Sequence, residues 1–295
     1  MTAVSDALSG AVDAASAAVV RVSGGRRPAT GVVWSADGVI VTTARVARRE
    51  SELTVTLSDG SELAATLAGR DRSTDLAVLR VRASALPVAR WRDADGLKVG
   101  QLVLALARPG RTMRARLGIL STVGQEWGVP GGSRIDRYIE PDIEPAFGIS
   151  GGPLIDAEGR AIGVNTARLQ RGTVLTIPTS TLRRVVDTLL AHGRVRRGYF
   201  GIAAQTVPVP AALESTVGGR AGLLVHEVEP GSPAERAGIL IGDLIYSIGG
   251  RPVSRPDQLM GLLTEDRIGA SESVRFVRAG RLEEVQVTIG DRPQQ

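Results

Sequence analysis

The sequence predicts a fold dominated by β-strands, with a large all-β domain followed by a smaller mixed domain. Short runs rich in valine, leucine, isoleucine and threonine recur along the 295 residues, and turn-forming residues separate them. Aromatic residues make up only 3 % of the chain, so aliphatic side chains must fill the cores, a composition that suits strands and small barrels. A basic stretch, Arg194–Gly198, interrupts this pattern and marks the best domain boundary.

The first domain begins with an alanine-rich segment, residues 5–20, whose apolar spacing predicts a short helix. Short, regularly spaced strands follow, a pattern typical of a sandwich or barrel, and Ser58-Asp59-Gly60 predicts a hairpin turn. A helix predicted over Thr181–Ala191 closes the domain, because its leucines and valines fall on one face. The predicted strands are Val19–Val22, Gly31–Trp34, Val39–Thr42, Leu53–Leu57, Glu62–Leu67, Leu76–Val81, Leu102–Leu106, Arg116–Val123, Tyr138–Ile139, Leu154–Ile155, Ala161–Thr166 and Val174–Pro178.

The second domain combines strands with short helices, separated by turns rich in glycine and proline. We therefore expect a first domain at residues 1–193, a linker at 194–198 and a second domain at 199–292. The elements predicted for the second domain are strands over Leu223–Val228 and Asp243–Ile248, helices over Ala234–Ala237 and Pro256–Leu263, and a hairpin of Val274–Arg278 with Val285–Ile289 across Ala279-Gly280-Arg281.

The composition argues against several classes of protein. The net charge of +5 is carried almost wholly by arginine, since Lys98 is the only lysine, and the arginines are scattered along the chain. Scattered arginines with few aromatic residues between them indicate a solvated surface, so we do not expect nucleic-acid binding. The chain has no cysteine, which excludes disulfides and thiolate metal sites, and we expect neither a metal nor a cofactor.

The sequence also bears on the membrane and on location. No apolar run approaches the ~20 residues that a membrane span needs. The first residues lack a basic n-region and carry Asp6 and Asp13, so they do not resemble a signal peptide. We therefore expect a cytoplasmic protein if Met1 is the native start, and an extracytoplasmic one if the chain has been trimmed.

Ser150 stands in the segment Phe147–Leu154, which reads FGISGGPL and is the setting of an activated serine nucleophile. A serine hydroxyl is a weak nucleophile until a neighbouring base takes its proton. The chain holds two histidines, His192 and His226, and both follow the serine. The serine setting indicates a protease, whereas the lack of a preceding histidine indicates that proteolysis has been lost. Taken alone, the glycine-rich segment is equally compatible with a plain tight turn.

Four segments follow one another with characteristic gaps. Ile40–Ala47 reads IVTTARVA, Asp71–Leu79 reads DRSTDLAVL, Leu117–Ser121 reads LGILS, and Gly148–Leu154 reads GISGGPL. They resemble, in order, the T-x-x-H-V, D-x-x-T-D-L-A-V-L, G-I-V-S and G-N-S-G-G-P-L motifs of the HtrA/Deg family. The resemblance covers nearly the whole chain, and it implies a trypsin-like double six-stranded β-barrel followed by a PDZ domain.

The resemblance implies a role for each matching residue. Ser150 takes the place of the nucleophile, Asp75 that of the orienting acid, and Arg45 that of the histidine. The backbone N–H groups of Gly148 and Ser150 take the place of the oxyanion hole. Ile149 replaces the family's asparagine between them, so the loop that carries the nucleophile is altered as well.

Arg45 decides the functional interpretation, because a guanidinium has a pKa above ~12 and no acceptor site, and cannot serve as a base. We expect Arg45 to form a forked ion pair with Asp75, to lower the pKa of that carboxyl and to plug the cleft. Removing a triad base costs about a million-fold in rate, so we expect no useful peptidase activity. Two alternatives stay open: another group acts as the base, or Arg45 lies exposed in a loop away from the cleft.

Arg197–Ile202 resembles the carboxylate-binding loop of PDZ domains. Its consecutive backbone N–H groups would form a nest for a chain-terminal carboxylate, and the peptide would add as a strand beside Ile202–Ala204. The helix predicted over Pro256–Leu263 would lie opposite and supply an apolar wall. The alternative is a plain core-forming strand. The peptide-binding residues predicted in this way are Tyr199, Phe200, Gly201, Ile202, Leu259, Leu262 and Leu263.

The sequence therefore favours a proteolytically inactive HtrA-like protein that binds peptide or protein C-termini, or unfolded polypeptide. Such a protein would act as an adaptor, a chaperone-like holder or a regulator of active HtrA relatives. The alternative is an active serine endopeptidase that uses a non-standard base. Family members often trimerise through aromatic residues near the N-terminus, but the first aromatic here is Trp34, so we expect a monomer or a different assembly.

Overall fold

The computed structural model describes residues 2–24, 27–46, 53–129 and 133–293. The chain divides into two compact units, Met1–Val129 with Arg134–Val195, and Pro130–Ser133 with Arg196–Gln295, and each is described by itself. Within the described ranges, no helix is both long and apolar enough to cross a membrane. The same ranges contain no group of three or more histidine, aspartate or glutamate side chains placed to hold a metal ion.

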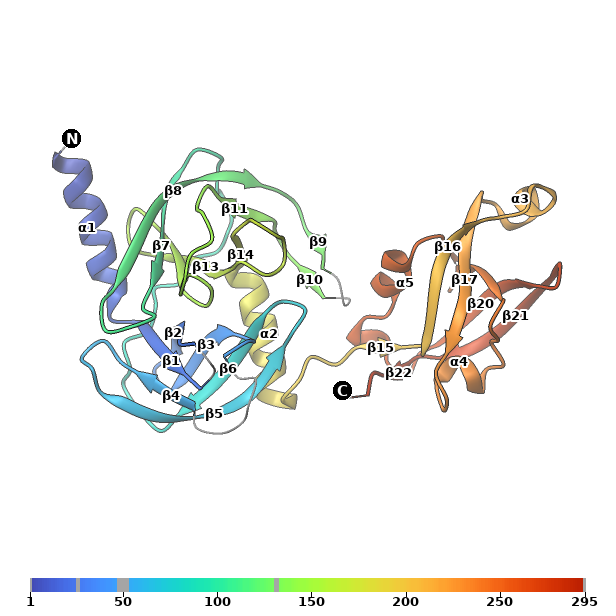
Figure 1. Ribbon diagram of the computed structural model, residues 1–295, viewed down its shortest axis with the longest axis horizontal. Helices are drawn as coiled ribbons and strands as arrows, with labels where there is room; N and C mark the ends of the chain where they lie inside the picture. Colours follow the sequence, from blue (N-terminus) through green and yellow to red (C-terminus); the bar gives the residue numbers. More distant parts are fainter. Residues whose placement is uncertain (1, 25–26, 47–52, 130–132, 294–295) are drawn as a thin grey trace. The chain divides into compact units, whose positions relative to one another are not determined.

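Six antiparallel strands of the first unit close into a barrel in the order β1-β2-β3-β6-β5-β4 (Figure 1). The barrel is filled by aliphatic side chains such as Val20, Ile40, Val55 and Leu79, as the scarcity of aromatic residues requires. Strand β3 is buried along its whole length, which fits its sequence VIVTT. The strands are β1 (Val19–Ser23), β2 (Ala29–Ser35), β3 (Val39–Thr43), β4 (Leu53–Thr56), β5 (Glu62–Asp71) and β6 (Leu76–Val81).

The following strands form a second six-stranded sheet in the order β11-β8-β7-β12-β13-β14, and its edge strands β11 and β14 lie side by side. Leu120, Leu154 and Ile162 are among the side chains that fill this half. A short ladder of β9 with β10 lies outside the sheet. The strands are β7 (Leu102–Ala107), β8 (Arg114–Val123), β9 (Trp127–Gly128), β10 (Arg134–Ile135), β11 (Ile139–Pro141), β12 (Pro153–Asp156), β13 (Ala161–Thr166) and β14 (Leu175–Pro178).

Helices begin and end the first unit. Helix α1 (Thr2–Ser16) packs the small side chains of Ala11 and Ala15 against the second sheet. Helix α2 (Thr179–His192) buries the face of leucines and valines that its 3.6-residue spacing predicts. It ends at Gly193, whose left-handed backbone (φ 70°) lets its N–H bond the carbonyl of Leu189.

The strands predicted for the first domain are all present, and the prediction of a β-dominated double barrel is confirmed. Most bounds agree to within two residues, and two elements end four residues from the predicted position. The helix predicted over 5–20 ends at Ser16, because the β-branched Val19 and Val20 belong to the barrel strand β1. Strand β5 continues to Asp71, beyond the hydrophobic run that predicted it, because its last residues still pair with β6.

The second unit is built on a five-strand path in the order β16-β17-β18-β20-β21, with short helices beside it (Figure 1). Phe200 and Phe276 lie at the centre of its core. Strand β16 and helix α3 were not predicted as such, because alanines and prolines obscure both patterns. The elements are β15 (Gly198–Tyr199), β16 (Ile202–Pro208), α3 (Ala211–Val217), β17 (Ala221–Val228), α4 (Pro233–Arg236), β18 (Leu244–Ile248), β19 (Arg251–Pro252), α5 (Pro256–Leu262), β20 (Ser271–Arg278), β21 (Arg281–Thr288) and β22 (Gly290–Asp291).

Candidate functional site

Ser150 lies in the turn between β11 and β12, and packing explains the glycines around it. Gly151 has a φ of 87°, and a Cβ at this position would lie 2.1 Å from the carbonyl oxygen of Thr30. Gly148 has a φ of 88°, and a Cβ there would meet the ring of Pro109 at 2.6 Å. Only glycine fits these two positions, so the turn can hold Ser150 against the first barrel at close range.

Hydrogen bonds from both halves of the unit fix this turn. The Thr30 hydroxyl donates to the Gly148 carbonyl at 2.7 Å and accepts the Arg108 N–H at 2.8 Å. The Gly151 N–H donates to the carbonyl of Asn165 at 2.8 Å. Thr30 belongs to β2, whereas Asn165 belongs to β13. The turn that carries Ser150 is therefore bonded to the barrel and to the second sheet at once.

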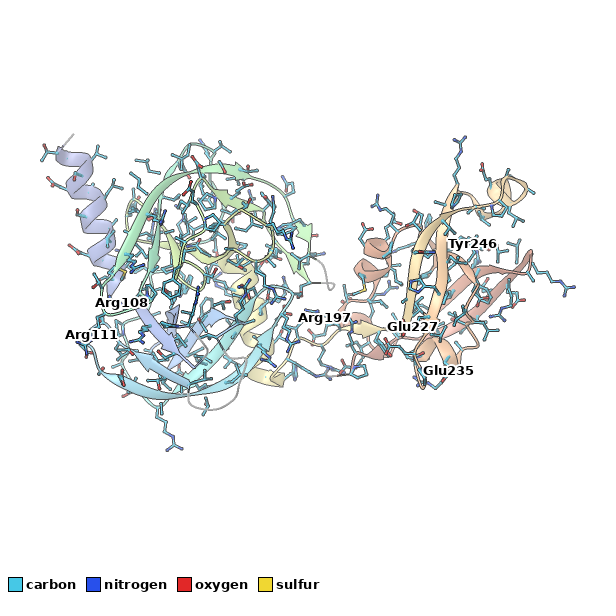
Figure 2. All side chains as sticks on the ribbon, in the orientation of Figure 1. Arg108, Arg111, Arg197, Glu227, Glu235 and Tyr246 are labelled. Atoms are coloured by element: carbon cyan, nitrogen blue, oxygen red, sulfur yellow. The ribbon has the colours of Figure 1, made fainter. Side chains whose placement is uncertain are left out.

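Arg108 connects this network to helix α1 (Figure 2). Its guanidinium donates to the carbonyl oxygens of Val19 at 2.8 Å, Ser16 at 3.2 Å and Arg111 at 3.4 Å. Ser16 is the last residue of α1, where the helix dipole favours a cation. Burial lowers the pKa of Arg108, but the carbonyl oxygens solvate the charge. Arg108 thus ties the end of α1 to the strand segment that bonds Thr30.

Two backbone N–H groups beside Ser150 lack an internal acceptor. In the described part of the chain, neither the Gly148 N–H nor the Ser150 N–H donates a hydrogen bond, whereas the Ile149 N–H between them donates to the carbonyl of Ala146 at 3.2 Å. The Ile149 side chain is 2 % exposed and packs in the core of the second sheet. These are the two N–H groups predicted to form an oxyanion hole, and they remain available to an external acceptor.

Asp75 lies directly before β6, with its side chain buried. Its Oδ2 accepts the Thr166 hydroxyl at 2.8 Å, while its Oδ1 accepts no hydrogen bond from the described residues. The guanidinium of Arg168 is the cation that approaches Oδ1, with Nη1 at 3.9 Å. The backbone of Asp75 is left-handed (φ 57°), a conformation that aspartate tolerates better than most residues.

A tight turn fixes the backbone leading to Asp75. The hydroxyls of Ser73 and Thr74 both donate to the buried Asp71 carboxylate, each at 2.8 Å to its nearer oxygen. The Ser73 N–H donates to the same carboxylate at 3.1 Å. The Asp71–Leu79 motif therefore encodes a side-chain-stabilised turn as well as the carboxyl at its end.

The expectation that the pKa of Asp75 is lowered is wrong. Burial raises the pKa of this carboxyl, and this effect exceeds the lowering by the Thr166 and Thr43 hydroxyls and by the charges of Arg168 and Arg45. The reason is that Oδ1 is withdrawn from water without receiving a hydrogen bond. A guanidinium that bonded both carboxylate oxygens of Asp75 would instead have lowered its pKa.

The predicted Arg45–Asp75 ion pair is also absent from the described residues. Arg45 follows β3 in the turn Ala44–Val46, and this turn is bonded to Asp75 through the Ala44 N–H, which donates to the Asp75 carbonyl at 3.0 Å. The Arg45 side chain is nevertheless exposed. A long guanidinium side chain on a surface turn is better solvated by water than by a carboxylate lying beneath it.

Among the residues that the structure describes, no basic side chain is hydrogen-bonded to Ser150. Its Oγ accepts the Ala167 N–H at 3.1 Å, and no described side chain accepts a hydrogen bond from it. His192 is exposed at the end of α2, and His226 is exposed on β17 of the second unit. Within the described ranges, neither histidine hydrogen-bonds with Ser150 or Asp75.

In the second unit, two backbone N–H groups of the loop from Tyr199 to Ile202 lack an acceptor among the described residues. In the described ranges, the N–H groups of Phe200 and Gly201 make no internal hydrogen bond, while their carbonyls accept from Ala234 at 2.9 Å and from Glu229 at 2.8 Å. Gly201 has a φ of 80°. Both amides can therefore serve an external acceptor. The loop leads into β16, which pairs with β17 only and is an edge of its sheet.

A hydrogen bond from the Tyr199 hydroxyl to the Glu229 carboxylate, at 2.5 Å, stabilises this loop. Burial and this carboxylate raise the pKa of Tyr199 to about 12. The leucines predicted to line the facing wall lie inside the core with Phe200: Leu259, Leu262 and Leu263 are at most 7 % exposed. They can form the floor of a peptide site rather than a freely exposed wall, and their contact with a peptide stays a prediction.

Comparison with known proteins places this geometry in a family. The trypsin-like peptidase domain matches residues 29–164, and the PDZ domain matches residues 224–268. A probable periplasmic serine endoprotease of the DegP-like type from Pseudomonas fulva (strain 12-X) is 34 % identical over 270 residues, which make up 90 % of this chain and 56 % of the relative. The putative serine protease HhoB of Synechocystis is 33 % identical over 279 residues, covering 90 % of this chain and 67 % of the relative.

Solved structures agree with these relatives. The serine endoprotease from Yersinia pestis superposes with a TM-score of 0.79 at 30 % identity, covering 97 % of this chain and 98 % of that one. The HtrA-type protease AlgW with a decapeptide gives a TM-score of 0.78 at 28 % identity over 98 % of this chain and 99 % of that one. This chain belongs to the HtrA-type serine protease family. It spans little more than half the length of the DegP-like relatives.

The HtrA-type fold predicted from the motifs, a trypsin-like double barrel with a PDZ domain, is confirmed. Sequence reasoning nevertheless missed residues at this HtrA-type site. Thr30, Thr166, Ala167 and Arg168 all contact the loop or the carboxyl of the predicted triad, yet none lies in the motifs that identified it. The one available signal was that Thr166 ends a predicted strand and that Ala167 and Arg168 directly follow it, where side chains often reach a site.

Proposed function

We propose that this HtrA-type protein has lost proteolytic activity through Arg45 at the histidine position, and that it binds peptide C-termini through its PDZ domain. The observation that supports the first half is the environment of Ser150. Its Oγ accepts a backbone N–H from Ala167, and no described side chain stands ready to take its proton. An unactivated serine hydroxyl is a weak nucleophile.

The chemistry of acyl transfer explains why this arrangement is inactive. A triad base must take the serine proton and later return it to the leaving amine. Arg45 has no lone pair for the proton, and Asp75 makes no hydrogen bond with Ser150 in the described residues, its carboxylate being contacted by Thr166 and Arg168. Losing the base costs about a million-fold, which leaves about 10³–10⁴ over water for the oxyanion hole and binding. The reaction that remains is too slow to count as peptidase activity.

The second half of the proposal rests on the Tyr199–Ile202 loop. Two open N–H groups, those of Phe200 and Gly201, can bind a carboxylate, and the neighbouring edge strand β16 can pair with an extended peptide. Ile202 lies at the start of this edge, and α5 packs beside the strand. The proposed ligands are the C-termini of peptides, proteins or unfolded polypeptide, with active HtrA relatives as further candidates. The AlgW structures with bound peptides support this assignment by similarity.

The names of the DegP-like relatives bear on location. They are described as periplasmic, so we place this protein outside the cytoplasm, against the expectation for a chain that starts at Met1. Fractionation of the producing cells tests this proposal. Recovery in the extracytoplasmic fraction is expected, and recovery only with cytoplasmic markers contradicts it.

Activity is tested with a fluorophosphonate probe and with casein, for the wild type and for Ser150→Ala. We expect both proteins to show the same background in labelling and turnover, while an active serine endopeptidase assayed in parallel reacts fully. The alternative is an active endopeptidase that uses a non-standard base. It predicts labelling and turnover in the wild type that disappear in Ser150→Ala, and this result would refute the proposed loss of activity.

Peptide binding is tested by fluorescence anisotropy with one labelled decapeptide in two forms, free carboxylate and carboxamide. Charged hydrogen bonds from Phe200 and Gly201 contribute about 1.5–3 kcal/mol each, so the amide should bind at least about ten-fold more weakly. Gly201→Ala is the matched variant, because a Cβ there would lie 2.1 Å from the Ser232 Cβ and distort the loop. Equal affinity for both peptides would contradict carboxylate capture.

A further inference from the structure

Three consecutive residues contact both groups that remain of the triad. The Thr166 hydroxyl donates to Oδ2 of Asp75 at 2.8 Å, and the Ala167 N–H donates to Oγ of Ser150 at 3.1 Å. The Arg168 guanidinium lies 3.9 Å from Oδ1 of Asp75. Thr166, Ala167 and Arg168 therefore form one segment, here named the 166–168 segment, that engages the orienting acid and the nucleophile together.

This segment is held in place from two sides. At its start, the neighbouring Asn165 is bonded to the nucleophile turn, with Gly151 N–H to Asn165 O and Asn165 N–H to Gly152 O, both at 2.8 Å. At its end, the Arg168 N–H donates to the Thr166 hydroxyl oxygen at 3.1 Å, which closes a tight turn. These hydrogen bonds fix the backbone of Arg168, from which its partly exposed side chain reaches Asp75.

We infer that Arg168, held at the end of the 166–168 segment, blocks the site independently of Arg45 by occupying the approach to Oδ1 of Asp75. This inference rests on the proposed function, because it names a second cause of the same loss of proteolytic activity. Oδ1 is the buried carboxylate oxygen without a hydrogen bond, and it is the atom that an orienting acid offers to the N–H of a triad base. A cation beside it disfavours the imidazolium that must form during acyl transfer.

Replacing Arg45 by histidine therefore does not restore the triad. The introduced imidazole meets a carboxyl that is already approached by Arg168, although the Ser150 hydroxyl, which accepts the Ala167 N–H, could still donate its own proton to it. Removing the Arg168 side chain takes away a like charge and opens Oδ1 at the same time. Both changes raise the pKa of the introduced imidazole, because both stabilise its protonated form.

The first test measures that pKa by NMR in Arg45→His and in Arg45→His/Arg168→Ala. Both exposed histidines, His192 and His226, are replaced by glutamine so that one imidazole signal remains. We expect the Arg168→Ala change to raise the imidazole pKa by about 1 pH unit or more. Arg171→Ala in the same background is the matched control, since Arg171 is an exposed arginine three residues further along that makes no contact with Asp75 in the described residues, and it should leave the pKa unchanged. Equal imidazole pKa values with and without Arg168 overturn the inference.

The second test follows fluorophosphonate labelling of the same variants. We expect Arg45→His to label at the rate of the wild type, and Arg45→His/Arg168→Ala to label about 10²-fold faster, the lower range for a positioned general base. Labelling of Arg45→His as fast as the double variant overturns the inference, because Arg45 alone would then account for the loss. Ser150-dependent labelling of the unmodified protein would instead refute the proposed function, so the two failures are distinguishable.

Discussion

The raised pKa of Asp75 predicts a specific pH dependence of stability. Burial raises the pKa above its ordinary value of 3.8, so the folded state holds this proton to higher pH than the unfolded state does. The wild type therefore loses stability as pH rises from 3.8 through the folded-state pKa. Asp75→Asn removes this loss, and asparagine tolerates the left-handed backbone (φ 57°) and can still accept the Thr166 hydroxyl.

The size of the effect follows from the linkage relation. Each pKa unit of difference between the two states is worth about 1.4 kcal/mol, and 1 kcal/mol moves the melting temperature of a domain of this size by about 2–4 °C. We expect the melting temperature of Asp75→Asn, relative to that of the wild type, to rise between about pH 4 and about pH 8, by about 3–6 °C for each pKa unit of difference between the two states. Calorimetry across this range measures the difference, and Asp93→Asn, which replaces an exposed carboxyl, serves as the control.

A relative melting temperature that falls as pH rises would refute this reasoning. It would mean that the carboxyl is more acidic in the folded state, as a close guanidinium partner would make it. The experiment therefore distinguishes the buried, singly bonded Asp75 of the structure from the Arg45–Asp75 fork that the sequence suggested.

One further substitution in each unit tests a contact that the structure makes essential for stability. Gly151→Ala should destabilise the first unit by about 2 kcal/mol or more in urea titration, since the Cβ would meet the Thr30 carbonyl at 2.1 Å on a backbone with φ 87°; a loss below about 0.5 kcal/mol would contradict the close approach. Arg278→Ala should cost the PDZ domain about 3 kcal/mol, because it leaves the buried Asp243 carboxylate without its partner at 2.7 Å. Arg275→Ala, which breaks an exposed pair, should cost under about 1 kcal/mol, and equal losses would contradict this assignment.

Local patterns were sufficient to predict most of the fold. Strand β3 is a continuous run of β-branched residues, and β6 is an aliphatic run interrupted only by the exposed Arg80, so burial and pattern agree. The β16 strand was harder to predict, because it is an edge strand whose residues are mainly half-buried or exposed and lack a strong hydrophobic alternation. The turn predicted over Ala279-Gly280-Arg281 is one residue too long. Arg281 pairs with Arg278, so only Ala279 and Gly280 form the turn between β20 and β21.

The site was predictable in its identities but not in its contacts. Ser150, Asp75 and Arg45 could be named because each lies within a short contiguous motif. The 166–168 segment could not, because Thr166 reaches Asp75 across 91 positions of sequence, and nothing local indicates that distance. The direction of the Arg45 side chain was equally hidden, since it depends on whether a surface turn gains more from water or from a buried carboxylate.

The structure also explains why the serine motif is weak evidence of catalysis in this chain. Gly148 and Gly151 avoid collisions with Pro109 and with the Thr30 carbonyl, and these contacts would exist whether or not Ser150 reacts. Asp75 likewise ends a turn that Asp71 holds together, and it anchors Thr166 across the two sheets. Packing of the double barrel is therefore sufficient to require most of the motif. Catalysis additionally needs a proton acceptor beside the Ser150 hydroxyl. Packing of the double barrel does not require such a group, so the reactivity of Ser150 must be measured directly.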